Sequence, residues 1–214
     1  MSAAKDATIA ETYKARLNAL KNGGGRKILG IVGPPGCGKS TLAAALLEFL
    51  GDDAVAVPMD GYHLANVELA RLGRAGRKGA EDTFDSAGYV SLLRRLKGQQ
   101  TNEIVYAPEF RREIEEPIAN AIPVFPETQL VITEGNYLLL DHGHWAGISE
   151  LLDEIWYVDI DHSVRRERLV RRHMHFGRSQ SAAEDWVANT DEPNAVRIEA
   201  TKHRADVLFN WEGE

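Results

Sequence analysis

The sequence contains one cysteine, Cys37, so the chain cannot form an intrachain disulfide. It also lacks the uninterrupted run of about 18 to 20 apolar residues that a membrane-spanning helix needs. Basic residues are the minority, with 25 Lys and Arg against 32 Asp and Glu and a net charge of −7. Such a balance lacks the positive field of non-specific nucleic-acid binders. The N-terminal segment carries acids and no apolar core, which is not typical of a secretory signal or a transit peptide. These absences predict a cytoplasmic protein that binds neither a membrane nor nucleic acid.

The composition itself is that of an ordinary globular protein, with 43% hydrophobic and 27% charged residues. Because 214 residues exceed the usual domain of about 150, we expect a single domain over 1–214 that carries an appended subdomain. Residues 1–25 are expected to form an amphipathic helix and a glycine linker, and residues 26–210 the core of the domain. The helix prediction rests on apolar residues at helical spacing, followed by three glycines: Ile9, Tyr13, Leu17, Leu20 and Gly23–Gly25.

Strand and helix patterns alternate along the core. Short apolar runs predict strands at 27–32, 54–59, 130–133, 154–159 and 206–209. Helical patterns cover 41–50, 86–97 and 162–175, and Ser181 with Glu184 fits a capping box that begins a further helix containing Trp186. Alternation at this spacing requires crossover connections, so the predicted fold is α/β, a three-layer sandwich with a mainly parallel sheet.

The alternation is interrupted between Tyr106 and Pro126, where prolines punctuate the stretch YAPEFRREIEEPIANAIPVFP. This pattern favours a loop followed by a hairpin. We interpret the insertion as a flap that covers the substrate.

A phosphate-binding motif begins where the first predicted strand ends. Gly33 to Ser40 matches G-x-x-x-x-G-K-[ST], between a strand and a helix as a P-loop requires. Backbone N–H groups of such a loop, together with the helix N-terminus, hold a triphosphate. Lys39 is expected to contact the outer phosphates and Ser40 a Mg²⁺ ion. The expected ATP-binding residues are Gly33, Pro34, Pro35, Gly36, Cys37, Gly38, Lys39, Ser40 and Thr41. Since the two prolines have no N–H donor, the contacts should come from Gly36 onward, and Cys37 is interpreted as a filler residue without a catalytic role.

Two acids follow predicted strands at the same edge of the sheet. Asp60 comes at the end of the strand at 54–59, where it could accept the proton of a substrate hydroxyl or be a turn residue before Gly61. Glu134 ends the run LVIT and could hold magnesium. In open parallel sheets this edge faces the ligand.

The Asn-Lys-x-Asp motif of GTPases and the signature of transporter ATPases are both absent from the sequence.

Several stretches together resemble the superfamily of uridine kinases, phosphoribulokinases and bacterial-type pantothenate kinases, and most closely the kinases associated with bacterial fructose transport systems. They are GPPGCGKST, MDGYHL, RKGAEDTFD, YAPEFRREIEEPI, LVITEGNYLLL and YVDIDHSVRRERLVRRH. The resemblance implies a P-loop kinase with ATP and Mg²⁺, Asp60 as general base, and Lys39, Ser40 and Glu134 as phosphate and metal ligands. It also implies that Tyr62, His63, Phe84, Asp85 and Tyr106 lie near the acceptor. Uridine kinases have a His-Pro stretch where this chain has Gly79–Asp82, and this difference disfavours recognition of a uracil ring.

An arginine-rich helix follows the strand at 154–159. At helical spacing Arg165, Arg168 and Arg172 share one face, which could close over the γ-phosphate. The alternative is that these arginines form a solvent-exposed helix face without a catalytic role. The resemblance places the lid at about 162–190 and makes Arg168 and Arg172 the catalytic candidates. The pairs His142/His144 and His173/His175 lack the further ligands of a zinc site and are interpreted as surface or hydrogen-bonding residues.

The sequence thus predicts a small-molecule kinase that phosphorylates a hydroxyl group, with a sugar as the preferred acceptor and a monomer or homodimer as the assembly. A nucleoside or pantothenate kinase remains open. So does a nucleotide-binding regulatory protein, in which partner binding would replace phosphoryl transfer.

Overall fold

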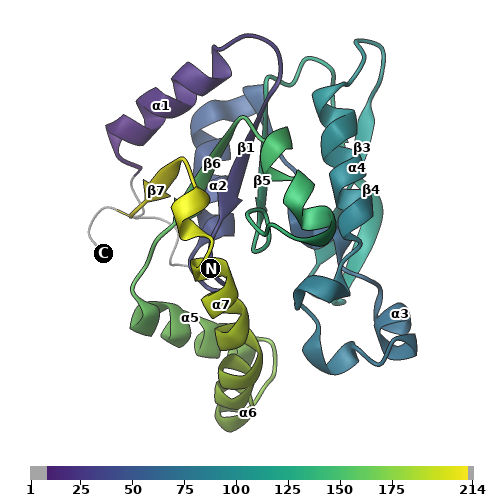
Figure 1. Ribbon diagram of the computed structural model, residues 1–214, viewed down its shortest axis with the longest axis vertical. Coiled ribbons are helices and arrows are strands. Elements are labelled where there is room, and N and C mark those ends of the chain that lie inside the picture. The colour runs from purple at the N-terminus through teal and green to yellow at the C-terminus, as the bar shows by residue number, and fades with distance from the viewer. Residues whose placement is uncertain (1–8, 212–214) are drawn as a thin grey trace.

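A computed structural model describes residues 9–211, so residues 1–8 of the predicted segment 1–25 lie outside the described residues. Its main sheet consists of five parallel strands in the order β2-β5-β1-β6-β7 (Figure 1). These are β1 (Lys27–Val32), β2 (Ala54–Ala56), β5 (Leu130–Gly135), β6 (Glu154–Val158) and β7 (Val207–Phe209). The predicted parallel α/β fold is confirmed. The position of β1 at the centre explains its sequence, because KILGIV is apolar on both of its faces.

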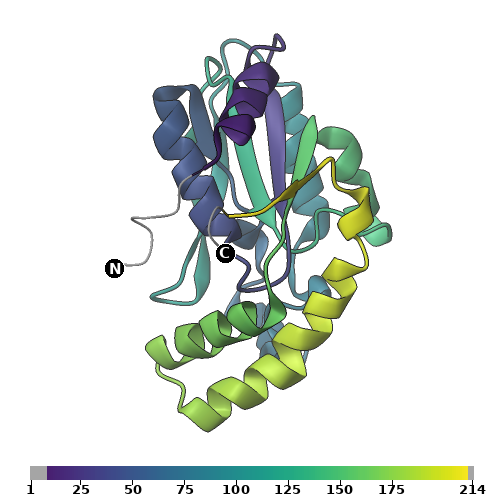
Figure 2. The ribbon, with the colours of Figure 1, turned by 90° about the vertical axis from the view of Figure 1, so that its left-hand side faces the viewer.

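Helices cover both faces of this sheet. On one face lie α1 (Glu11–Lys21) and α2 (Lys39–Leu50), and on the other lies α4 (Ser86–Lys97). The other helices are α3 (Asn66–Arg71), α5 (His162–His175), α6 (Gln180–Trp186) and α7 (Glu192–Glu199). Alternate residues of β1 face opposite layers: Leu29 and Ile31 belong to a core with α1 and α2, and Ile28 and Val32 to a core with α4 and the hairpin. Figures 1 and 2 show the resulting three layers.

Several predicted boundaries differ from the observed ones by one to three residues, and three of them have local reasons. The helix α6 begins at Gln180, because the side chain of Ser179, not Ser181, accepts the free N–H of Ala182. The strand β2 ends at Ala56, and after Pro58 the chain enters a 3₁₀ turn at Met59–Tyr62. The strand β7 begins at Val207, since the Asp206 carboxylate accepts the N–H of Ile155 at 2.8 Å.

The insertion between Tyr106 and Pro126 contains an antiparallel hairpin, as predicted. The strands β3 (Val105–Arg111) and β4 (Glu116–Val124) form a separate two-stranded sheet beside α4 (Figure 1). The hairpin packs tightly on the turn that carries Asp60. A β-carbon built on Gly61 would lie 2.4 Å from the carbonyl oxygen of Pro108. Only a residue without a side chain lets the two backbones approach this closely.

This contact makes Gly61→Ala a test of hairpin docking. We expect the substitution to destabilise the protein by about 1–3 kcal/mol, because the added methyl group displaces backbone rather than a flexible side chain. Chemical denaturation measures the change. Gly76→Ala is the matched control, since nothing lies within 4 Å of a β-carbon at Gly76. Equal stability of the two variants would contradict the close packing.

The helices α5, α6 and α7 extend beyond the carboxyl end of the sheet (Figure 2). A single π-helical turn, Val187–Asp191, joins α6 to α7.

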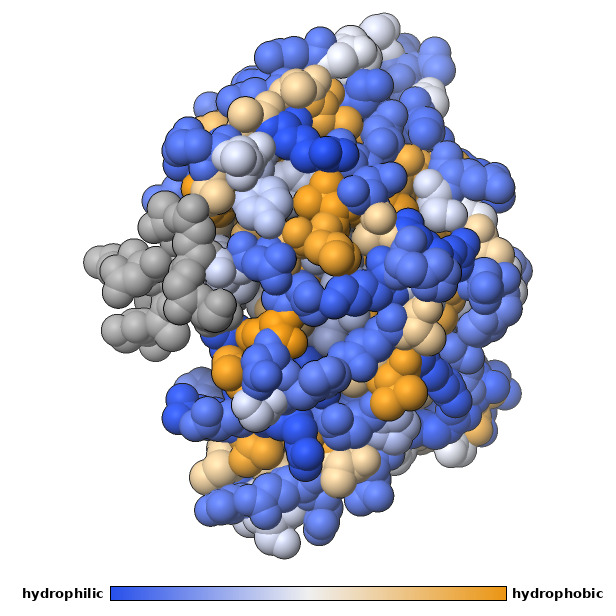
Figure 3. Space-filling model, turned by 60° about the vertical axis from the view of Figure 1, so that its left-hand side comes forward, coloured by the Kyte–Doolittle hydropathy of each residue, from blue (hydrophilic) through white to orange (hydrophobic). Residues whose placement is uncertain are grey.

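On the face in Figure 3 most side chains are hydrophilic, and the apolar ones form small separate groups. Within residues 9–211, no helix is both long enough and apolar enough to cross a membrane.

Candidate active site

The carboxyl ends of β1, β2 and β5 meet at one edge of the sheet, where a pocket of about 420 Å³ opens beneath α5 and α7. The phosphate-binding loop follows β1, Asp60 follows β2, and Glu134 is the next-to-last residue of β5. Nine residues predicted for the site line this pocket: Pro35, Gly36, Lys39, Ser40, Asp60, His63, Phe84, Glu134 and Arg172. The sheet therefore gathers side chains that are far apart in the sequence.

The phosphate-binding loop has the backbone that its glycines predict. Gly38 stands at the N-cap of α2 with φ of 97°, a left-handed conformation that favours glycine. The buried Lys39 ammonium donates to the carbonyl oxygens of Gly33 at 2.9 Å and Pro34 at 3.2 Å. Cys37 is fully buried, and burial raises the pKa of its thiol. A thiol that resists ionisation is a poor nucleophile, which agrees with its interpretation as a filler residue.

Ser40 and Glu134 lie side by side below the loop. The Ser40 hydroxyl donates to Oε1 of Glu134 at 2.9 Å. Burial raises the pKa of Glu134, and the nearby charge of Asp60 raises it further. A hydroxyl and a carboxylate oxygen are donors that suit Mg²⁺, which takes few protein ligands when phosphates supply the others. The donor set thus fits the expected ion. Within residues 9–211 no group of three His, Cys, Asp or Glu side chains forms a metal cluster.

The raised pKa of Glu134 gives a stability prediction for the protein without nucleotide or metal. Since the folded protein binds this proton more tightly than the unfolded chain, the stability associated with it is lost as pH rises through the raised pKa. Glu134→Gln keeps an oxygen for Ser40 and carries no charge. We expect the variant to melt above the parent, by about 2–4 °C for each kcal/mol gained, with a gap that widens as pH rises. Calorimetry over a pH series, with exposed Glu48→Gln as control, checks this; a gap that narrows would contradict it.

Asp60 lies where the hairpin meets the main sheet. Its carboxylate oxygen Oδ2 accepts from Nη2 of Arg112 at 3.2 Å. His63 Nδ1 lies 2.8 Å from the carbonyl oxygen of Asp60, and because a carbonyl only accepts, this nitrogen carries the proton. Burial lowers the pKa of His63, so the ring is held neutral beside Asp60. The charge of Asp60 is therefore opposed by an arginine and not by an imidazolium.

The residues expected near the acceptor separate into two groups. His63 and Phe84 line the pocket, with their rings 4.0 Å apart. Tyr62 packs on Tyr89, the Asp85 carboxylate caps α4 by accepting the N–H of Gly88 at 2.8 Å, and Tyr106 is 48% exposed on the hairpin. The structure does not bring these last three side chains to the pocket.

Sequence reasoning did not identify Lys78, Phe110 or Arg112, which all line the pocket. Lys78 belongs to the segment between α3 and α4, and Arg112 follows directly after β3. Both lie in irregular backbone, where no periodicity marks the inward side. The only signal was that the stretches RKGAEDTFD and YAPEFRREIEEPI contain them.

The three arginines on one face of α5 have different surroundings. Arg165 is buried, forms an ion pair with Glu192 at 2.6 Å and donates to the Pro35 carbonyl, which ties α5 to α7 and to the loop. Arg168 lies beside Gly38, outside the pocket lining. Arg172 lines the pocket; burial lowers its pKa, whereas nearby carboxylates, including Asp60 and Glu134, raise it. Of the three, Arg172 is the one that lines the pocket in which Asp60 and Glu134 lie.

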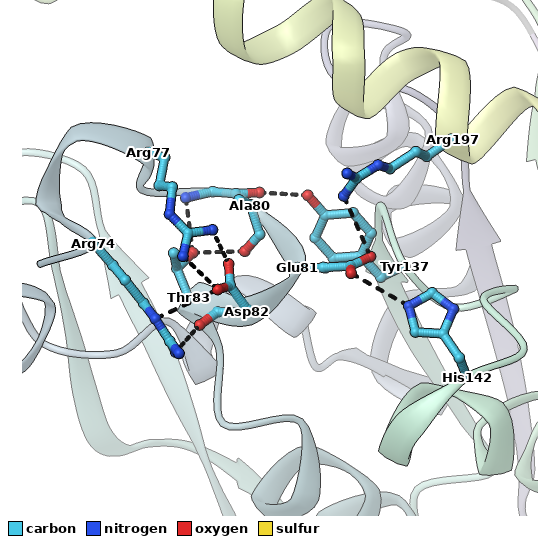
Figure 4. Close-up of polar contacts among 10 residues, drawn as sticks. Arg74, Arg77, Ala80, Glu81, Asp82, Thr83, Tyr137, His142 and Arg197 are labelled. Atoms are coloured by element: carbon cyan, nitrogen blue, oxygen red, sulfur yellow. Dashed lines mark hydrogen bonds and ion pairs between the residues drawn. The ribbon is translucent and has the colours of Figure 1, made fainter. Parts of the chain in front are cut away.

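The segment Gly79–Asp82, which differs from uridine kinases, is held from outside the pocket (Figure 4). Asp82 pairs with Arg77, and with Arg74 at 3.4 Å, while Glu81 pairs with His142 at 3.3 Å and Arg197 at 3.8 Å. The Tyr137 hydroxyl donates to the Gly79 carbonyl at 2.6 Å. Neither acid lines the pocket. These contacts fix the backbone that carries Lys78.

The family to which this chain belongs is shown by its sequence. A family profile described as the phosphoribulokinase / uridine kinase family matches residues 28–213. The chain is a member of this family. It is therefore a P-loop kinase, a phosphotransferase that uses ATP.

Individual relatives agree with this assignment. The kinase is 36% identical over 197 residues to a protein of Schizosaccharomyces pombe named "putative uridine kinase", which covers 88% of this chain and 83% of that protein. The crystal structure of a "putative fructose transport system kinase" from Silicibacter sp. TM1040 aligns with a TM-score of 0.84 and 37% identity, over 94% of this chain and 98% of that one. Phosphoribulokinase from Rhodobacter spheroides shares the fold, with a TM-score of 0.64 at 14% identity over 86% of this chain and 70% of that one.

Proposed function

We propose that this kinase transfers the γ-phosphoryl group of ATP to a hydroxyl group of a small metabolite of the sugar type. One observation carries the proposal: Asp60 shares a single pocket with Lys39, Ser40, Glu134 and Arg172. A base and a phosphate-binding loop in one pocket are what transfer to an alcohol requires.

In this proposal each residue has a separate task. The loop from Gly33 to Thr41 holds the nucleotide phosphates. Asp60 takes the proton of the attacking hydroxyl as its oxygen bonds to the γ-phosphorus and the bond to the β-phosphate oxygen breaks. Arg172, with Arg168 as a second candidate, stabilises the charge on the transferred group. Ser40 and Glu134 would hold Mg²⁺, which supplies positive charge to the phosphate oxygens.

The names of the relatives point to two types of acceptor, a sugar and a nucleoside. The aromatic rings of the pocket favour the sugar. His63 packs on Phe84 with centroids 4.0 Å apart and on Phe110 at 4.6 Å, both at tilted angles, so these rings contact one another and present no flat stack for a base. Polar groups also line this end of the pocket, among them Asn66 and Lys78, and they suit a ligand rich in hydroxyl groups.

A coupled assay of ADP release tests the proposal with sugars, nucleosides and pantothenate as acceptors. We expect ATP hydrolysis to be slow alone and to accelerate when a sugar-type acceptor is added. If a nucleoside gave the highest kcat/KM, a nucleoside would replace the sugar as the proposed acceptor. Failure of every acceptor to accelerate ADP release would favour a nucleotide-binding regulatory protein. A monomer or homodimer in the cytoplasm stays a prediction.

A further inference from the structure

Two cations, Lys78 and Arg112, occupy the end of the pocket that the hairpin and the α3–α4 segment form. Both stand close to one ring: Lys78 Nζ is 5.1 Å and the Arg112 guanidinium carbon 5.9 Å from the centre of Phe110. The positive charges of both also lower the pKa of His63, in addition to the larger effect of burial. The two cations therefore act on the same small region beside Asp60.

Lys78 has only neutral hydrogen-bond partners. Its ammonium donates to Oδ1 of Asn66 at 2.7 Å and to the carbonyl oxygen of Glu115. Between residues 9 and 211 no carboxylate lies within ion-pair distance of it, and the Glu116 carboxylate is taken by the backbone N–H of Asn66 at 3.0 and 3.1 Å. Burial lowers the pKa of Lys78, and the charges of Glu115 and Glu116, which lie beyond ion-pair distance, oppose this shift. Lys78 thus carries a partly desolvated charge that no anion of its surroundings neutralises directly.

Arg112 has a weak partner that a ligand can replace. Its contact with Asp60 is 3.2 Å long, beyond the 2.7–2.9 Å of strong charge-assisted bonds, and the two side chains are 43% and 26% exposed. Ion pairs with that exposure contribute little. When Asp60 receives the proton of the acceptor hydroxyl, the guanidinium is available for another group of the same molecule.

The segment that carries Lys78 is also held in place without help from a ligand. The backbone on either side of Lys78 is fixed by the ion pairs of Arg77 with Asp82 and by the hydrogen bond from Tyr137 to Gly79 (Figure 4). Lys39, by contrast, belongs to the phosphate-binding loop. The pocket therefore holds Lys39 in the phosphate-binding loop and two further cations, Lys78 and Arg112, on other segments of the chain.

We propose that the acceptor carries an anionic group, a phosphate or a carboxylate, which Lys78 and Arg112 bind beside Phe110 while a hydroxyl of the same molecule reaches Asp60. This inference rests on the proposed function and narrows its substrate class to sugar phosphates or sugar acids. A neutral sugar would offer no negative charge to either cation, so Lys78 would keep only neutral hydrogen-bond partners and Arg112 only its long contact with Asp60.

Kinetics with matched acceptors test the inference. Fructose, a fructose monophosphate and gluconate are compared in the ADP assay, with the parent protein, Lys78→Met and Arg112→Met. We expect a higher kcat/KM for an anionic acceptor than for fructose, and the better anion decides between phosphate and carboxylate. Each substitution should raise the KM for that anion by about 10- to 100-fold, the value of a hydrogen bond to a charged group, and leave the KM for ATP unchanged. Arg111→Met, which removes a neighbouring arginine paired with Glu109 at 2.7 Å, is the control.

Calorimetry separates this inference from the proposed function. The protein is first saturated with a non-hydrolysable ATP analogue and magnesium, and the same three compounds are then titrated. An anion that binds the parent, binds the two variants weakly and is not phosphorylated would support the inference and overturn the kinase proposal for that class. Three results would overturn the inference. The kcat/KM for fructose could equal that for the anionic acceptors, the KM for the anion could be unchanged in both variants, or neither anion could give heat on binding.

Discussion

Asp60→Asn should lower turnover by about 10²–10⁴, the usual contribution of a positioned general base, while ATP still binds. Asparagine has nearly the same shape and keeps an oxygen that can accept from Arg112, so the hairpin contact at 3.2 Å should survive. It cannot take the proton of the acceptor hydroxyl. Steady-state kinetics give turnover, and calorimetry with an ATP analogue gives nucleotide affinity.

The matched control is Asp52→Asn, an exposed acid in the turn after α2. It should turn over acceptor at the parent rate. If Asp60→Asn were fully active, Asp60 would be only a turn residue before Gly61, and another group would have to receive the proton.

Lys39→Ala should weaken both ATP binding and turnover, with a fall in kcat/KM of about 10²–10³, the range for loss of one preorganised charged donor. The Lys39 ammonium is buried under the loop, held by the carbonyl oxygens of Gly33 and Pro34. Removal of this charge leaves the nucleotide phosphates without their nearest side-chain cation. Kinetics with varied ATP separate the effects on KM and kcat.

Two controls accompany this variant. Lys97→Ala removes an exposed lysine on α4 that donates to the Leu151 carbonyl, and it should leave the kinetics unchanged. Lys39→Arg retains the charge but replaces a point charge by a planar fork, so it should recover only part of the activity. Retention of both binding and turnover in Lys39→Ala would end the assignment of this loop to the phosphates.

The elements that the sequence predicted best are those that local chemistry specifies. Apolar strands covered on both faces, helices with a clear 3.6-residue period and a glycine loop between them each depend on near neighbours in the chain. The predicted boundaries were wrong where a single side-chain hydrogen bond sets the end of an element, as that of Ser179 does at the start of α6. The crossover rule predicted a parallel sheet but not the strand order β2-β5-β1-β6-β7. The order depends on contacts between segments across the whole chain.

The site was predictable to the same extent. Lys39 and Ser40 belong to one motif, and Asp60 and Glu134 follow strands that a parallel sheet must align. Arg112 could not be found in this way, because it meets Asp60 across 52 positions of the chain and only through the docked hairpin. Tyr106 lies outside the pocket lining, and the sequence could not show this, because a hairpin residue points inward or outward according to a register set by its partner strand.

The sequence by itself determined that this chain is an α/β protein with a phosphate-binding loop and two acids at strand ends, since these features are written in spacing and residue type. Tertiary structure alone decided what stands opposite that loop. The close contact of Gly61 with Pro108 brings the hairpin against Asp60, and with it Phe110 and Arg112 beside Lys78. Such a contact depends on the packing of two backbones, which no local pattern in either segment records.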